Sequence, residues 1–228
     1  MPLLGEAAML LAFDVEQEAI AEHDHWHTHE HFPERLSIPG FLRGTRWVAP
    51  AGSPRYCVLY EVESLATLTS AAYLARLEAP TPWTAQMMRH YRGMARGFCV
   101  VRGSFGLGVG GFARVVRFRP PEGEGADLRR RLLEEALPAL PSRPGIAGAH
   151  LLEGAATPPM TREQRIRGAD RGVDWAIVLT GYDAEALAEA LCAGPAADAL
   201  ARHGARDVAS AAYRLDYALA RDELAVRR

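Results

Sequence analysis

Residues 37–47 read SIPGFLRGTRW and residues 143–152 read RPGIAGAHLL, so each stretch places a Pro-Gly pair before an apolar run. The two Pro-Gly pairs lie 105 residues apart. Three further pairs of blocks correspond in the same order: MLLAFDV (9–15) with RVVRFRP (114–120), TAQMMRHYRG (84–93) with ADALARHGAR (197–206), and CVVRGSF (99–105) with AAYRLDY (211–217). Four collinear matches predict an internal duplication of the chain.

Both copies predict the same order of elements, β-α-β-β-α-β, which is the ferredoxin-like unit. The predicted copies span residues 8–108 and 111–220, joined by the glycine-rich stretch 102–112. Two helices cover only one face of such a sheet, so each copy is left with a second apolar face. We therefore predict an α+β fold in which the copies pack sheet to sheet as an intramolecular α/β barrel.

The chain has 228 residues, 49% of them hydrophobic and 24% charged, and a formal net charge of −2. This ordinary globular composition provides no argument for binding nucleic acid or an anionic membrane. The N-terminus has no basic n-region, so the cytoplasm is the expected compartment. Three scattered cysteines predict no disulfide framework, and Cys57 and Cys99 are expected as buried thiols.

The block WHTHEHFPERLSIPGFLRGTRW (26–47) resembles the EthD-like members of the dimeric α/β-barrel superfamily. The resemblance rests on Trp26, on the His-x-Pro motif of His31 and Pro33, and on the Pro-Gly pair at 39–40. It covers residues 8–106 well, whereas the second copy keeps only the Pro-Gly. The resemblance implies a site between sheet and helices, in a superfamily of lactone isomerases, cofactor-free oxygenases, polyketide cyclases and haem proteins. One histidine site is expected in this chain.

Residues 23–31, HDHWHTHEH, hold most of the histidines of the chain and are expected to be helical. His23, His27 and His31 then lie on one face at spacings of four residues. An HxxxH pair is a weak metal signal because a closed site needs further ligands from elsewhere. Among the candidates for such ligands are His90, His150 and His203. No physiological metal and no cofactor is therefore predicted.

Two readings of the histidines remain open beside the metal site. In the first, His27 and His31 are catalytic acid–base groups at the end of a helix, because Pro33 disfavours helical geometry at Phe32 and the helix is expected to end near His31. The exposed carbonyl dipoles of such an end favour a protonated imidazole. In the second reading, the stretch is a polar helix face without chemistry.

Five further residues are candidate substrate-binding groups. Trp26, Trp47 and Trp83 are expected to line one apolar pocket. Arg46 is a candidate anchor for a carboxylate, with an exposed salt bridge as the alternative. Tyr91 completes the stripe of Trp83, Met87 and Met88 on a helix predicted over residues 82–94, although such a stripe is usually plain core packing. The charged loop 157–172 within the insertion is expected to be solvated, either as a mobile flap or as a simple loop.

Three functions follow from these candidates. The first is a cofactor-independent enzyme that isomerises, cyclises or dehydrates a small aromatic, lactone or polyketide-like molecule by histidine acid–base chemistry. The second is a non-catalytic small-molecule-binding or stress-response protein that uses the same cavity. The third is a haem- or metal-binding protein. A homodimer of the duplicated chain is compatible with each function.

Overall fold

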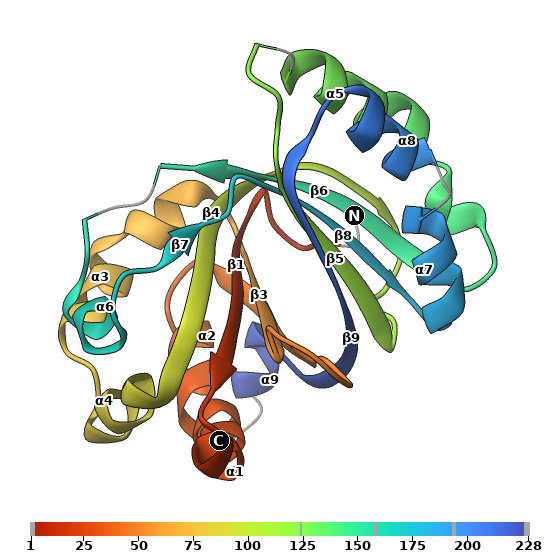
Figure 1. The fold of residues 1–228 in the computed structure, drawn as a ribbon. Coiled ribbons are helices and arrows are strands. Elements are labelled where there is room, and N and C mark those ends of the chain that lie inside the picture. Colours follow the sequence, from red (N-terminus) through yellow and green to blue (C-terminus); the bar gives the residue numbers. More distant parts are fainter. Residues whose placement is uncertain (1–2, 124, 157–158, 193–194, 226–228) are drawn as a thin grey trace.

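Eight strands of the computed structural model close into an antiparallel barrel, with the helices packed on its outside (Figure 1). The structure describes residues 3–123, 125–156, 159–192 and 195–225. The barrel strands are β1 (Ala7–Val15), β2 (Phe41–Val48), β3 (Tyr56–Val62), β4 (Tyr91–Gly106), β5 (Phe112–Arg119), β6 (Ile146–Ala155), β8 (Trp175–Gly181) and β9 (Arg206–Ala220). A short strand, β7 (Arg171–Gly172), pairs in parallel with β4. The predicted α+β barrel fold is confirmed.

The strand order is the same in the two halves of the chain. It is β4-β1-β3-β2 in the first half and β9-β5-β8-β6 in the second, the order of a ferredoxin-like sheet. Pairing of β2 with β9 and of β4 with β6 joins the halves and closes the ring. This order supports the duplication, and the boundaries 8–108 and 111–220 remain a proposal.

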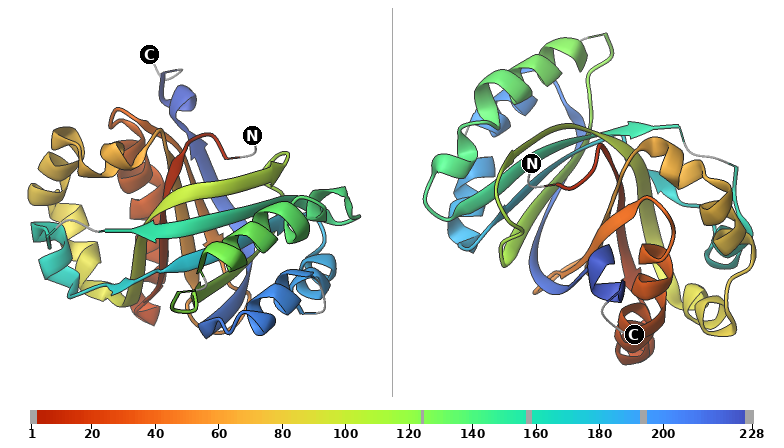
Figure 2. Two further views of the ribbon diagram at one scale, coloured as in Figure 1. Left: turned by 90° about the horizontal axis from the view of Figure 1, so that it is seen from above. Right: turned by 180° about the vertical axis from the view of Figure 1, so that it is seen from behind.

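The helices form two groups, one outside each half of the barrel (Figure 2). No helix among the described residues is long and apolar enough to cross a membrane. The first group is α1 (Ile20–Trp26), α2 (Phe32–Leu36), α3 (Ala71–Glu78), α4 (Pro82–Met87), α6 (Arg162–Arg167) and the C-terminal α9 (Arg221–Ala225), and the second is α5 (Gly125–Arg131), α7 (Ala184–Cys192) and α8 (Pro195–Arg202). The helix α6 comes from the second half of the chain but lies beside α3 of the first half (Figure 1).

Two local features recur at the spacing of 105 residues. Gly40 and Gly145 both have φ of +88°, a conformation that favours glycine, and each ends the turn before the second strand of its half. A π turn occupies His27–His31 in the first half and Leu132–Ala136 in the second. Repetition of such an uncommon turn further supports the duplication.

Alternation of side chains along the strands produces three separate cores. One fills the barrel, where Leu10, Leu59 and Val178 meet. Cys57 and Cys99 belong to this interior as predicted, and burial raises the pKa of each thiol to about 12. The other two cores lie between the sheet of each half and its helices. The first of these outer cores contains the candidate site.

The structure corrects two predicted helix boundaries. The first helix does not end at His31, because Phe32 is helical (φ −60°, ψ −52°) and donates its N–H to the carbonyl of His27, five residues back. Proline clashes with the carbonyl four residues earlier in a regular α-helix, and this π turn replaces the regular geometry before Pro33. The helix predicted over 82–94 also stops early: α4 ends at Met87, and Tyr91 begins β4.

Candidate functional site

A small cavity lies between the outer face of the first half of the barrel and the helices that cover it. The space open to the centre of a water molecule is about 30 Å³, room for roughly two waters. The polar residues that line it are His27, His31, Arg35, Tyr60, Tyr73, Tyr91, Arg96, Glu163 and Arg167, and the apolar residues are Met9, Leu11, Phe13, Val58, Met88 and Met94.

Three histidine rings form a ladder along one side of this region. The ring centroids of His23 and His27 are 5.0 Å apart, and those of His27 and His31 are 5.3 Å apart. His23 is buried on α1, whereas His27 and His31 begin and end the π turn. The indole of Trp26 packs 4.5 Å from the His31 ring and donates to Glu30 at 3.1 Å. The sequence-predicted face of three histidines is therefore present, and it points inward.

Burial determines the protonation of His27 and His31. Loss of solvation is the largest cause that lowers the pKa of both imidazoles well below 6.5, and neighbouring positive groups add to it. The main such neighbour of His31 is Arg35. The sequence predicted a helix end near His31, where exposed carbonyl dipoles would favour the imidazolium. This prediction was wrong, because the helix continues past His31. Both rings are neutral near pH 7, so each has one ring nitrogen that carries a lone pair.

His27 and His31 differ in the hydrogen-bond partners of their Nδ1 atoms. Nδ1 of His27 lies 3.4 Å from Nη1 of Arg46. Arginine is always a donor, so Nδ1 of His27 accepts and its proton sits on Nε2. Nδ1 of His31, in contrast, is buried and finds no partner among the described residues. His31 is thus suited to accept a proton, and His27 to donate a hydrogen bond.

Two further buried polar atoms around the cavity lack a hydrogen bond among the described residues: Oη of Tyr60 and Nε of Arg96. Nε of Arg96 is 3.1 Å from Oδ2 of Asp170, an ion pair that is not aligned as a hydrogen bond. Buried polar groups are normally paired because leaving one unpaired costs about 1–3 kcal/mol. The concentration of such atoms at one cavity indicates a place where a ligand or ordered water binds.

A buried ion network lines the cavity on the side of α6. Nη2 of Arg35 contacts Oε2 of Glu163 at 2.5 Å, and Arg167 contacts Asp170 at 2.8 Å and Glu163 at 3.4 Å. The side chains of Glu163 and Arg167 are only 5% and 3% exposed. The expectation of a solvated insertion was therefore wrong for α6, because Glu163 pairs with Arg35 of the first half and Arg167 pairs with Glu163 and Asp170.

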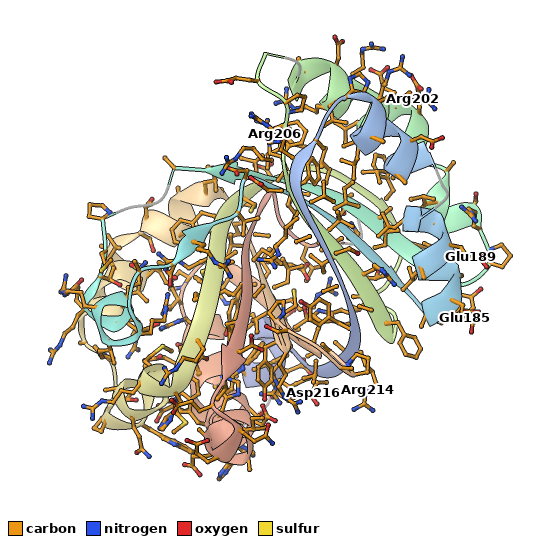
Figure 3. The ribbon with its side chains drawn as sticks, viewed as in Figure 1. Glu185, Glu189, Arg202, Arg206, Arg214 and Asp216 are labelled. Carbon is orange, nitrogen blue, oxygen red and sulfur yellow. The ribbon has the colours of Figure 1, made fainter. Side chains whose placement is uncertain are left out.

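Arg46 is buried beside the ladder rather than exposed. Its Nε contacts Oδ2 of Asp216 at 2.7 Å, and its guanidinium lies over the ring of Tyr217. Asp216 is labelled on β9 in Figure 3. Because Asp216 supplies the carboxylate, a substrate carboxylate is not needed to balance Arg46. Its place beside His27 makes it a group that fixes the orientation of that imidazole.

Other predicted residues lie apart from the cavity. Trp47 points to the opposite face of β2 from Arg46 and, with His150, lines a second small cavity inside the barrel. The prediction that Trp47 and Trp26 line the same pocket was therefore wrong. Trp83 is half-buried on α4 and donates to Glu22 at 2.8 Å, outside the cavity. Tyr91 and Met88 do line it. His90 pairs with Glu16, and His203 lies on the far group of helices.

Sequence reasoning missed Tyr60, Arg35, Arg96, Glu163 and Arg167. Tyr60 could have been found, because alternation along residues 56–62 places it on the same face as Val58. The arginines carry no such signal, since most arginines of the chain are exposed. The contribution of Glu163 depends on how the second half folds back over the first.

The described residues contain no group of three or more His, Cys, Asp and Glu side chains arranged to hold a metal ion. The 30 Å³ beside His27 and His31 holds neither a haem macrocycle nor a ring-sized ligand without an enlargement of the cavity. We derive no chemical step through a metal or haem.

No protein-family model matches the chain, and no curated protein matches its sequence. Solved structures do match its fold. An anthrone oxidase-like protein matches with a TM-score of 0.69 at 10% identity, over 97% of this chain and 96% of the other. A putative monooxygenase from Lactobacillus acidophilus scores 0.59 at 8% identity, over 94% and 96%.

A chlorite dismutase from Candidatus Nitrospira defluvii, in complex with imidazole, scores 0.53 at 13% identity, over 97% of this chain and 94% of the other. At such low identities these similarities concern the fold alone. Together with the closed eight-strand ring they place the chain among proteins of the dimeric α/β-barrel fold, here completed within one chain.

Proposed function

We propose that the protein is a cofactor-independent enzyme that moves a proton on a small lactone-like or aromatic molecule, with His31 as the base. The observation that carries the proposal is that three buried polar atoms of residues lining one cavity make no hydrogen bond among the described residues: Nδ1 of His31, Oη of Tyr60 and Nε of Arg96, the last of which is in an ion pair with Asp170. Titratable groups with strongly shifted pKa values beside a cavity favour a catalytic site over plain packing.

The chemistry that suits this arrangement is removal of a proton from a carbon next to a carbonyl group. Neutral His31 takes the proton, and the electron pair of the C–H bond forms an enolate. Hydrogen bonds from His27 and from Tyr60 or Arg96 stabilise the enolate oxygen. Return of the proton to another carbon completes an isomerisation, and loss of a leaving group completes a dehydration. Neither route needs an oxidant.

Binding of even a single ring needs more space than roughly two waters occupy. We place the entrance at α6, which has only six residues and contacts the first half through ion pairs. An outward shift of α6 would enlarge the cavity at the Arg35–Glu163 contact without disturbing the barrel. Substrate binding and the strength of this contact are then linked.

The finer assignments are part of the same proposal. The motif of Trp26, His31, Pro33 and Gly40 resembles that of EthD-like proteins and supports membership of that group. The names of the anthrone oxidase-like and monooxygenase structures support a small organic ligand. A cytoplasmic location and a homodimer are also proposed. The second candidate function is a non-catalytic small-molecule binder, in which the same buried polar atoms without hydrogen bonds would contact the ligand.

Deuterium exchange at carbon tests the proposal without knowledge of the natural substrate. α-Angelica lactone, a single ring, and 2-coumaranone, an aromatic lactone, each carry an acidic CH₂ group. We would incubate each with the protein in D₂O without oxygen and follow that group by ¹H NMR against protein-free buffer. Exchange of either compound above the buffer rate is the expected result. Binding without exchange would favour the non-catalytic protein, and neither binding nor exchange would contradict both functions.

A further inference from the structure

His23 has no part in the proposed acid–base pair, yet it is completely buried and bonded at both ring nitrogens. Its Nε2 lies 3.1 Å from Oη of Tyr91, which lines the cavity. Its Nδ1 lies 3.0 Å from Oδ1 of Asp24, whose side chain is 33% exposed. The three side chains therefore form a continuous hydrogen-bonded chain from a residue that lines the cavity to a partly exposed carboxylate.

The direction of each bond in this chain follows from the donor types. A carboxylate only accepts hydrogen bonds, so Nδ1 of His23 must donate to Asp24. In a neutral imidazole Nε2 is then an acceptor, and the hydroxyl of Tyr91 must donate to it. Burial lowers the pKa of His23 and raises that of Tyr91, while hydrogen bonds from His23 and Tyr56 lower that of Asp24. All three groups are in the states that this chain requires.

We propose that Tyr91, His23 and Asp24 form a proton relay that exchanges protons between the cavity and solvent. Oη of Tyr91 accepts a proton from a water or hydroxyl group in the cavity while its own proton moves to Nε2 of His23. The Nδ1 proton of His23 moves to Asp24, which releases it to water. Tyr91 and His23 end neutral, and no electrons are transferred.

Packing around His23 fixes how the relay is reset. The ring contacts Phe13, Tyr56 and Trp26 at centroid distances of 5.8, 4.6 and 5.8 Å, which hold its plane. After an outward transfer His23 carries its proton on Nε2. The packed ring cannot flip to restore the starting tautomer, which has the proton on Nδ1. A later inward transfer restores it. Such a device suits a reaction in which a proton leaves the site and a proton returns, so its catalytic use rests on the proposed function.

The surroundings of His23 favour relay over storage of charge. Besides Asp24, the charged groups that act on it are Arg46 and Arg55, and both disfavour the imidazolium. Tyr56 donates to the same oxygen of Asp24 at 2.8 Å. His23 therefore passes a proton on without holding it. A purely structural hydrogen bond would need neither the exposed carboxylate nor the cavity.

Exchange of the Tyr91 hydroxyl tests the relay without any substrate. Tyrosine labelled with ¹³C at Cζ shows a deuterium isotope shift, so transfer into D₂O reports the exchange rate of each hydroxyl. Asp24→Asn keeps a hydrogen-bond acceptor but loses the proton acceptor, and should slow exchange at Tyr91 by about tenfold or more. Tyr213, buried inside the barrel, is the internal control. An unchanged rate at Tyr91 would overturn the relay.

A second experiment connects the relay with catalysis. Tyr91→Phe keeps the ring that stacks on Phe13 and removes only the hydroxyl. At saturating α-angelica lactone we expect deuterium incorporation to fall by about tenfold, with the KM unchanged and Tyr213→Phe unaffected. A raised KM with an unchanged maximal rate would assign Tyr91 to binding and overturn the catalytic use of the relay. Absence of exchange in the wild type would contradict the proposed function, while the hydroxyl measurement would still decide the relay.

Discussion

Arg35 on α2 and Glu163 on α6 are 128 residues apart in sequence and form a buried ion pair of 2.5 Å. Through this contact the second half of the chain supplies one wall of the cavity of the first half. Removing one partner of a buried pair leaves an unpaired charge, which costs about 3–5 kcal/mol. Glu34 also contacts Arg35 at 3.1 Å and limits the loss.

We therefore expect Glu163→Gln to lower the free energy of unfolding by about 3 kcal/mol, measured by urea denaturation. The matched control is Arg165→Gln on the same helix, whose exposed contact with Glu78 contributes little. If both variants were equally stable, the ion pair would not hold α6 in place.

The buried histidines predict a dependence of stability on pH. Because the pKa values of His27 and His31 are below 6.5 in the folded state, the unfolded chain binds more protons as the pH falls through 6.5. The free energy of unfolding should therefore decrease from pH 7 to 5.5, by up to about 1.4 kcal/mol per pH unit for each histidine. His27→Gln should make this slope shallower. An equal slope in the variant would indicate that His27 is not buried as a neutral ring.

The unpaired hydroxyl of Tyr60 predicts a conflict between stability and binding. Tyr60→Phe removes a buried group without a partner among the described residues, so the folded protein should gain about 1 kcal/mol. The same variant should bind 2-coumaranone more weakly, because an oxygen of the ligand loses its donor. Thr180→Val removes a similarly unpaired hydroxyl from the barrel interior and should leave binding unchanged. Stronger binding by Tyr60→Phe would contradict the assigned role.

The placement of Trp47 makes a further prediction. Its indole donates to Oγ1 of Thr45 at 2.9 Å inside the barrel, across the sheet from His27. Trp47→Phe should destabilise the protein through lost packing, while exchange of α-angelica lactone proceeds at the wild-type rate. A reduced exchange rate with unchanged stability would contradict this placement and indicate that Trp47 contributes to the candidate site.

Much of the fold could be predicted because local patterns determine it. The Pro-Gly pairs precede β2 and β6, and the apolar runs became the barrel strands, since turn chemistry and alternation act over short distances. The continuation of the first helix past Pro33 could not be predicted from those patterns. It depends on the π turn, which in turn packs Phe32 against Gly44 of β2, where a Cβ would meet the ring at 2.4 Å.

The candidate site was predictable only in part. The four-residue spacing placed His23, His27 and His31 on one face, and Tyr91 does line the cavity. Burial of that face, and with it the neutral state of the imidazoles, requires knowledge of what covers it. The strand face of Trp47 and the partner of Arg35 both depend on contacts between distant segments, which periodicity does not report.

The central claim is that a buried neutral His31 removes the proton, and one comparison tests it most directly. Carbon-bound deuterium incorporation into α-angelica lactone would be measured for His31→Gln and for His29→Gln. His29 shares the π turn but is outside the cavity, with its Nδ1 bonded to the carbonyl of His25. We predict a loss of about 10²-fold or more for His31→Gln and wild-type exchange for His29→Gln. Equal exchange by the two variants would contradict the account.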